Sequence, residues 1–119
     1  MNTFKVNSLR EIDKLVAQYI FDWSVFSYLE LGYKLTGIYK DKRENVPYYS
    51  NNIFNAYEVL NYFPFYTLEK TNSSYNKWRY RCYLCCLDEY EIEICAPTAE
   101  LAICLAALKV KGIEVIYEE

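Results

Sequence analysis

The sequence has 119 residues, of which 53% are hydrophobic and 24% charged, and its formal net charge is −3. This length predicts a single domain over residues 1–119, and the composition excludes a disordered chain. The negative charge gives no overall attraction to nucleic acid or to an anionic membrane, so we expect neither as a partner. No stretch approaches the roughly 20 apolar residues that a membrane helix needs. The first residues lack the basic patch and apolar core of a signal peptide, so we expect a cytoplasmic protein.

An amphipathic helix is predicted from about residue 9 to residue 20. Ser8 and Glu11 form the S-x-x-E pattern of a capping box, in which the two side chains satisfy backbone N–H groups of the first turn. Behind it, apolar residues recur on one helical face and polar residues on the other. The predicted core face is Leu9, Ile12, Leu15, Val16 and Tyr19, and the predicted solvent face is Arg10, Asp13 and Lys14.

The segment from Phe21 to Pro47 leaves two alternatives open. Its apolar residues, among them Trp23, are too numerous to remain in water, and Gly32 and Gly37 interrupt it. The charged stretch at 41–45 is typical of a solvated loop tip. A short extra hairpin and an extension of the first helix both fit this composition.

A second helix is predicted after Pro47, with Ser50 or Asn51 as its cap and Pro64 as its end. Its predicted core face is Ile53, Ala56, Tyr57, Leu60 and Phe63. Strands follow, separated by turns at 71–74 and 88–89. The predicted strands cover residues 65–69, 75–87 and 90–95.

The C-terminal stretch from Cys95 to Glu119 anchors the predicted fold. Pro97 and Thr98 suit the first positions of a helix, and Gly112 can end it in a left-handed conformation. Alanines leave little side chain on one flank, so this helix can approach a sheet closely, and apolar residues cover most of its surface. A closing strand is predicted at 113–117.

This order of elements predicts an α+β fold. Helices that come before and after one sheet imply that both of its faces are covered. We therefore expect a three-layer α-β-α sandwich with a mostly antiparallel central sheet, which includes residues 78–84 and 113–117.

Motifs over most of the chain resemble those of one family. They are the capped helix that ends near Trp23, the P-Y-x-S at 47–50, the aromatic-E-V turn at 57–59, the tryptophan-bearing strand at Trp78, the helix at 98–108 (TAELAICLAAL) and the terminal GIEV strand. Together they resemble the phage ABA sandwich domain, found in small proteins of phages and prophages of Gram-positive bacteria. The resemblance implies an α-β-α sandwich and a phage accessory protein in a bacterial cytoplasm. It offers no catalytic residues, and residues 25–45 depart from the family pattern.

The cysteines Cys82, Cys85, Cys86 and Cys95 raise the question of a zinc site. A structural zinc site needs its C-x-x-C on a tight knuckle, whereas this motif lies in a predicted strand, where positions three apart face opposite ways. The chain has no histidine to complete a ligand set, and five cysteines fit reduced thiols in a cytosol. We favour small buried residues and expect no metal.

One predicted strand interleaves basic and aromatic residues. Its basic face is Lys77, Arg79 and Arg81, and its other face is Trp78, Tyr80 and Cys82. Such a row can bind phosphates and stack bases, but a solvated basic row above an aromatic core row has the same alternation, and we favour this second reading. The basic residues stay candidates for binding an acidic partner or a small phosphorylated ligand.

The 14 tyrosines are the remaining signal, because tyrosine is a favoured anchor at protein interfaces. Several lie around the second helix, and Tyr48 and Tyr49 are the candidate binding residues.

No stretch resembles a phosphate-binding glycine loop, a nucleophile elbow or a metal triad. We therefore expect a protein that is not an enzyme and needs no cofactor. The favoured function is a phage accessory protein that binds a host bacterial protein and inhibits a host system such as anti-phage defence. The alternative is a binder of a nucleotide-type ligand, held by the basic row between the protomers of a homo-oligomer.

Overall fold

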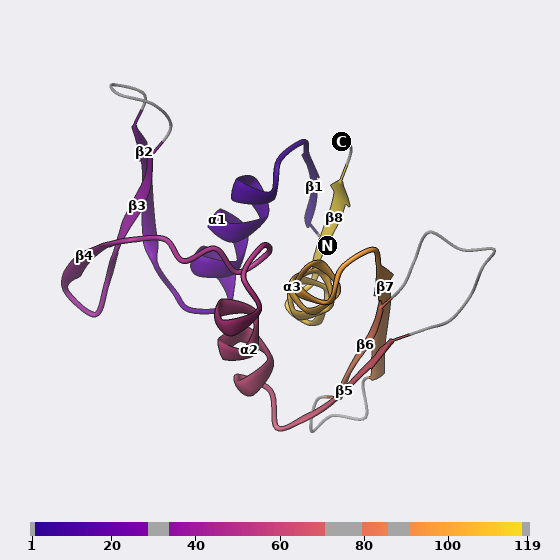
Figure 1. Ribbon diagram of the computed structural model, residues 1–119. Helices are drawn as coiled ribbons and strands as arrows, with labels where there is room; N and C mark the ends of the chain where they lie inside the picture. The colour runs from indigo at the N-terminus through magenta and orange to yellow at the C-terminus, as the bar shows by residue number, and fades with distance from the viewer. Residues whose placement is uncertain (1, 29–33, 71–79, 86–90, 118–119) are drawn as a thin grey trace.

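The computed structural model describes residues 2–28, 34–70, 80–85 and 91–117 (Figure 1). Three helices and eight strands are formed by these described residues. The helices are α1 (Leu9–Tyr19), α2 (Ile53–Asn61) and α3 (Ala99–Val110). The strands are β1 (Asn2–Val6), β2 (Ser24–Tyr28), β3 (Lys34–Tyr39), β4 (Lys42–Asn45), β5 (Phe65–Lys70), β6 (Tyr80–Cys85), β7 (Glu91–Ala96) and β8 (Ile113–Tyr117).

The central element is α3, which packs against α1 and α2 on one side and against β6, β7 and β8 on others (Figure 1). The Thr98 hydroxyl caps the helix by accepting a hydrogen bond from the Leu101 N–H at 3.2 Å. At the other end Gly112 has a φ of 79°, which glycine adopts without strain. The buried residues of α3 lie all round the helix, so it forms the core itself. The predicted cap, glycine stop and apolar cover are confirmed.

The strands form three sheets. β1 pairs with β8 in parallel, while β2–β3–β4 and β5–β6–β7 are antiparallel. The predicted α+β sandwich with mostly antiparallel strands is confirmed. The two segments predicted to share one sheet both form strands, β6 and β8, but they pair in different sheets. The reason is β1, which was not predicted and which provides the strand partner of β8.

The strands β5 and β7 match the predicted strands at 65–69 and 90–95 closely. The long predicted strand at 75–87 is represented by β6, and its remaining residues lie outside the described part of the chain. The predicted turns at 71–74 and 88–89 lie outside it as well.

The segment between α1 and α2 forms strands, in agreement with the hairpin alternative. The chain leaves α1 through Asp22, which has a φ of 58°, and the Trp23 N–H donates to the Ala17 carbonyl at 2.9 Å. Lys40 and Asp41 join β3 to β4 with φ values of 50° and 65°, the left-handed pair of a type I′ hairpin turn. The predicted loop tip at 41–45 is fully exposed, but most of it forms β4.

The cap of α2 differs from the predicted one. Asn52 caps the helix, since its Oδ1 accepts from the N–H groups of Phe54 and Asn55 at 2.9 and 3.2 Å. Ser50 or Asn51 was expected there, but the side chain of Ser50 is bonded elsewhere. None of the described helices is long and apolar enough to span a membrane.

Candidate functional site

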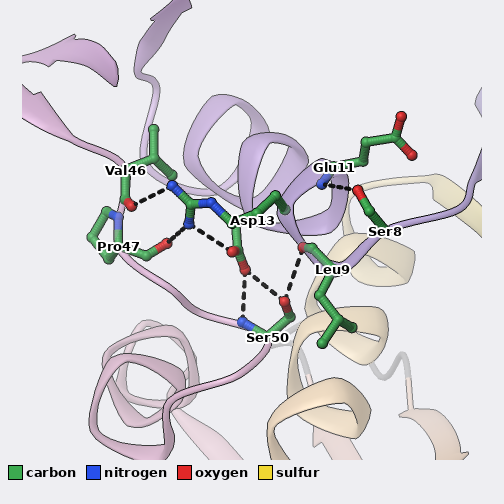
Figure 2. A network of polar contacts seen from close by, with 8 residues as sticks. Ser8, Leu9, Glu11, Asp13, Val46, Pro47 and Ser50 are labelled. Atoms are coloured by element: carbon green, nitrogen blue, oxygen red, sulfur yellow. Dashed lines mark hydrogen bonds and ion pairs between the residues drawn. The ribbon is translucent and has the colours of Figure 1, made fainter. Parts of the chain in front are cut away.

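A buried polar network joins α1 to the loop before α2 (Figure 2). Asp13, predicted to face solvent, has 0% of its surface exposed. Its Oδ1 lies 2.7 Å from both the backbone nitrogen and the Oγ of Ser50, and its Oδ2 lies 2.7 Å from Arg10 Nη1. The Arg10 guanidinium also donates to the carbonyl oxygens of Val46 and Pro47, at 3.0 and 3.1 Å. The network therefore holds the loop that buries Asp13.

Ser50 joins Asp13 to the first turn of α1 through its side chain. Ser50 Oγ lies 2.9 Å from the Leu9 carbonyl oxygen and 2.7 Å from Asp13 Oδ1, yet it has a single proton to donate. Burial raises the pKa of Asp13, and the bonds from Ser50 and Arg10 oppose this rise only in part. Ser50 is 2% exposed, so the network is a buried clamp between α1 and the loop before α2.

Arg81 is the one predicted basic site residue within the described part of the chain, in β6. Its guanidinium lies 3.2 Å from a carboxylate oxygen of Glu93 on β7 and 3.9 Å from one of Glu69 on β5. Opposite charges on neighbouring strands stabilise a sheet, so Arg81 is partnered within the chain. Lys77 and Arg79 lie outside the described residues.

The two candidate tyrosines differ in their environments. Tyr48 is 53% exposed, and the Arg10 guanidinium carbon lies 4.0 Å from the centroid of its ring, a cation–π contact. Tyr49 is 2% exposed and stacks on Phe21, with ring centroids 5.4 Å apart. Burial raises the pKa of Tyr49. The structure therefore leaves Tyr48 at the surface but places Tyr49 in the core, where it cannot meet a partner.

A group of exposed aromatic residues lies on the outer side of α2. Phe54 is 79% exposed, Tyr57 45% and Tyr62 48%. Phe54 and Tyr57 are three residues apart and so are neighbours on the helix surface, and Tyr62 directly follows the helix; we call these three the α2 aromatic face. The opposite side of α2, which packs toward α3, is buried: Ala56, Val59, Leu60 and Phe63. Tyr57 was predicted to lie in the core, and Val59 is buried in its place.

Two further exposed tyrosines flank the α2 aromatic face in the sequence, namely Tyr48 before the helix and Tyr66 after it, 48% exposed. Tyr62 also contacts Lys111, the residue after α3, since Lys111 Nζ lies 5.1 Å from the centroid of the Tyr62 ring. Grouped exposed aromatic residues are typical of interaction surfaces, whereas single ones need no explanation.

Comparison with known proteins places this fold in a family. The family model described as the phage ABA sandwich domain matches residues 14–108, which is more than half of the chain. The chain belongs to the phage ABA sandwich domain family. The crystal structure of a phage protein from Bacillus cereus ATCC 14579 is similar over 93% of this chain and 95% of that chain, with a TM-score of 0.70 and 26% sequence identity. No curated protein matches the sequence.

The membership confirms the resemblance read from the sequence motifs. In this ABA sandwich domain, Ser50 of the P-Y-x-S motif has a structural role, since its N–H and its hydroxyl group donate the hydrogen bonds that hold Asp13 and the Leu9 carbonyl. The matched residues include all of α2 and so the α2 aromatic face. They exclude β1 and β8, which form the parallel pair.

Sequence reasoning about this ABA sandwich domain missed Phe54. It singled out tyrosine by its abundance, whereas Phe54 could have been found from helical spacing. With Ile53, Ala56 and Leu60 on the core face, position 54 falls outside that face.

Cys82 and Cys104 are packing residues of the domain core. Cys82 and Cys104 are buried, and burial raises the pKa of Cys82 to about 12 and that of Cys104 as well. Cys95 is half-buried and lies opposite Arg81 in the sheet. Within the described ranges, no three His, Cys, Asp or Glu residues are grouped to hold a metal ion.

Proposed function

We propose that this phage ABA sandwich protein is a non-enzymatic accessory protein that binds a host bacterial protein through the α2 aromatic face. The observation that carries the proposal is the 79% exposure of Phe54, one helical turn from the exposed Tyr57. Aromatic side chains provide large contact areas with few rotatable bonds and are frequent anchors of interfaces. The family context favours the cytoplasm of a bacterial host as the place of action and inhibition of a host system as the outcome.

The packing of α2 supports a binding role for its outer side. The inner side is fixed against α3 through buried residues such as Val59 and Leu60. A helix held in this way presents its outer residues in fixed positions, and this reduces the conformational entropy lost on binding. The alternative, a phosphorylated ligand on the basic row, has less support because Arg81 already faces Glu69 and Glu93.

Affinity capture with matched variants tests this proposal. Immobilised wild type should retain a stoichiometric protein from a lysate of a Gram-positive host, identified by mass spectrometry. The double variant Phe54→Ala/Tyr57→Ala should lose this protein, because two interface anchors are removed, each worth about 2 kcal/mol or more. Ile38→Ala, at an apolar position 42% exposed on β3, is the control and should retain it. Equal retention by the double variant would refute a role for the α2 aromatic face.

A further inference from the structure

The strand β5 forms an outer edge of the β5–β6–β7 sheet. One side of β5 pairs with β6, and within the described residues no strand pairs with its other side. Figure 1 shows β5 at the margin of the sheet, and α3, which packs on β6 and β7, makes few contacts with it. Four of the five residues from 66 to 70 are exposed, so side chains on both faces of this strand are open to solvent. The N–H and C=O groups of such an edge can pair with a further strand.

The core face of the sheet is left partly open at β5. Leu68 pairs with the buried Cys82 of β6, so both lie on the face that packs against α3. Tyr66 and Lys70 are two positions away on either side and share this face. Yet Tyr66 is 48% exposed, Lys70 is exposed and Leu68 is only half-buried. An additional strand beside β5 would extend the covered core over these side chains.

The sequence of β5 is complementary to itself when two copies run antiparallel. With a two-fold axis beside Leu68, residues equally distant from the axis on the two copies face each other. Leu68 then faces Leu68 of the second copy, and Tyr66 faces Lys70 of the second copy, which gives one apolar pair and two cation–π pairs. On the other face of the strand Thr67 opposes Glu69, whose carboxylate can accept a hydrogen bond from the threonine hydroxyl. Every position from 66 to 70 therefore meets a compatible side chain.

Other edge strands lack this complementarity. β7, at the opposite edge of the same sheet, has Glu91 and Glu93 on one face, and antiparallel pairing of two copies about Ile92 would oppose like charges. All four residues of β4 are polar and exposed, and charged side chains of this kind keep an edge strand in water. β5 instead begins with aromatic and β-branched residues, which favour strands.

We propose that this chain forms a homodimer in which the β5 strands of two copies pair antiparallel about Leu68. The pairing joins two three-stranded sheets into one sheet of six strands, and main-chain hydrogen bonds satisfy the open edge. Because both copies use the same edge, the two-fold axis closes the assembly at two chains. The pairing uses no residue of the α2 aromatic face, so this inference goes beyond the proposed function and does not depend on it.

Sedimentation equilibrium of the full chain across the micromolar to millimolar range tests dimer formation. A dimer that dissociates on dilution is expected. Tyr66→Lys should raise its dissociation constant at least about tenfold, because two like-charge pairs with Lys70 replace two cation–π pairs. Tyr66 is exposed, so this variant should keep the circular dichroism spectrum of the folded protein. A wild type that is monomeric at every concentration overturns the proposal.

Two further variants locate the dimer contact. The double variant Tyr66→Lys/Lys70→Glu places opposite charges together again and should bring the dissociation constant back to within about threefold of wild type. Tyr57→Lys makes the same change on the α2 aromatic face, and it should leave the dimer unaltered while weakening capture of the host protein. A dimer that Tyr57→Lys dissociates, that Tyr66→Lys leaves intact, or that the double variant fails to restore overturns the proposal.

Cysteine substitution tests the register of the two β5 strands. Across the axis the Cα atoms of the two Leu68 residues should lie about 4.5–5.5 Å apart, within the range of a disulfide. The two Glu69 residues are diagonal neighbours about 7–8 Å apart, beyond that range. On mild oxidation Leu68→Cys should therefore form a disulfide between copies, located by mass spectrometry of the linked peptides, and Glu69→Cys should not. Equal cross-linking of the two variants, or of neither, overturns this pairing.

Discussion

Asp13 owes its burial to residues distant in the sequence. It is one turn into α1, and the side chain and backbone that cover it belong to Ser50. Helical periodicity reports which side of a helix a residue is on, but not what later part of the chain will cover that side. For this reason the pattern that correctly placed Ile12 and Val16 in the core assigned Asp13 to solvent.

The substitution Asp13→Asn should change how stability depends on pH. Burial raises the folded-state pKa of Asp13 above its usual value of 3.8, so the stabilisation due to the protonated form is complete below about pH 3.8. It is lost as the pH rises through the folded-state pKa. In urea unfolding at several pH values from about 4 to about 8, the free energy of unfolding of wild type relative to Asp13→Asn should fall as pH rises.

Asp22→Asn is the matched control for this measurement. Asp22 is exposed and has a φ of 58°, which asparagine also adopts readily, so this variant should follow the wild type at every pH. A relative stability that rises with pH would contradict the prediction. It would mean that the ion pair with Arg10 outweighs the burial of Asp13.

The role of a single residue could be predicted from the sequence where it depends on a few adjacent residues. It could not be predicted where it depends on residues that are distant in the sequence and close in space. The caps at Ser8 and Thr98 and the stop at Gly112 depend on a few adjacent residues, and all three are present. Tyr48 and Tyr49 are adjacent and chemically identical, yet one is exposed and the other is in the core. No local rule distinguishes them, because the loop conformation that separates them is fixed by the Asp13 clamp.

Among the elements, α3 is closely packed because several of its buried residues are alanines. Ala102, Ala106 and Ala107 have 0% exposure, although alanine has little surface to bury. These alanines allow the neighbouring helices and strands to approach α3 closely. The larger buried residues Ile103 and Leu108 fill the remaining space between α3 and these elements. The helix is thus packed on all sides.

Ala106→Leu should destabilise the protein by about 1–3 kcal/mol, because a larger side chain must be accommodated in a filled site. Intrinsic helix propensity barely changes between these two residues. Lys109→Leu, at an exposed position of the same helix, is the control and should alter stability by less than about 0.5 kcal/mol. Chemical denaturation followed by circular dichroism measures both. An unchanged midpoint for Ala106→Leu would mean that this side of α3 has free space.

Element prediction failed mainly at β1. Phe4 and Val6 alternate with Thr3 and Lys5, which is the pattern of a strand, but five residues before a capped helix give a weak signal. The strand forms because β8 pairs with it from the far end of the sequence. The hairpin at β2–β4 was one of two alternatives, and tertiary contact between α1 and β2 accompanies it.

For the whole molecule, native-state hydrogen exchange should rank the elements by their place in the fold. Amides of α3 should exchange slowest and only through global unfolding, since this helix contacts most other layers. Amides of β4, whose four residues are all exposed, should exchange through local opening at much lower free energy. NMR at low denaturant concentrations measures both. Protection in β4 equal to that in α3 would contradict this order.

The fold class could be predicted because the order and chemistry of the elements restrict how they can pack. The pairing of β1 with β8 could not, because it depends on contacts between residues more than a hundred positions apart, such as Phe4 and Val115. The α2 aromatic face was predictable only as an excess of tyrosine, since exposure depends on which side of α2 meets α3.

The position of α3 late in the chain has a consequence for biosynthesis. Residues nearer the N-terminus emerge from the ribosome first, and a domain generally folds as a unit once all of it has emerged. Here α1, α2 and the β5–β6–β7 sheet have no common core to pack against until residues 99–110 have been synthesised. β1 is synthesised before β8 and must wait for it before it can pair. The nascent chain therefore exposes its apolar faces until α3 emerges, and we expect it to depend on protection by chaperones up to that point.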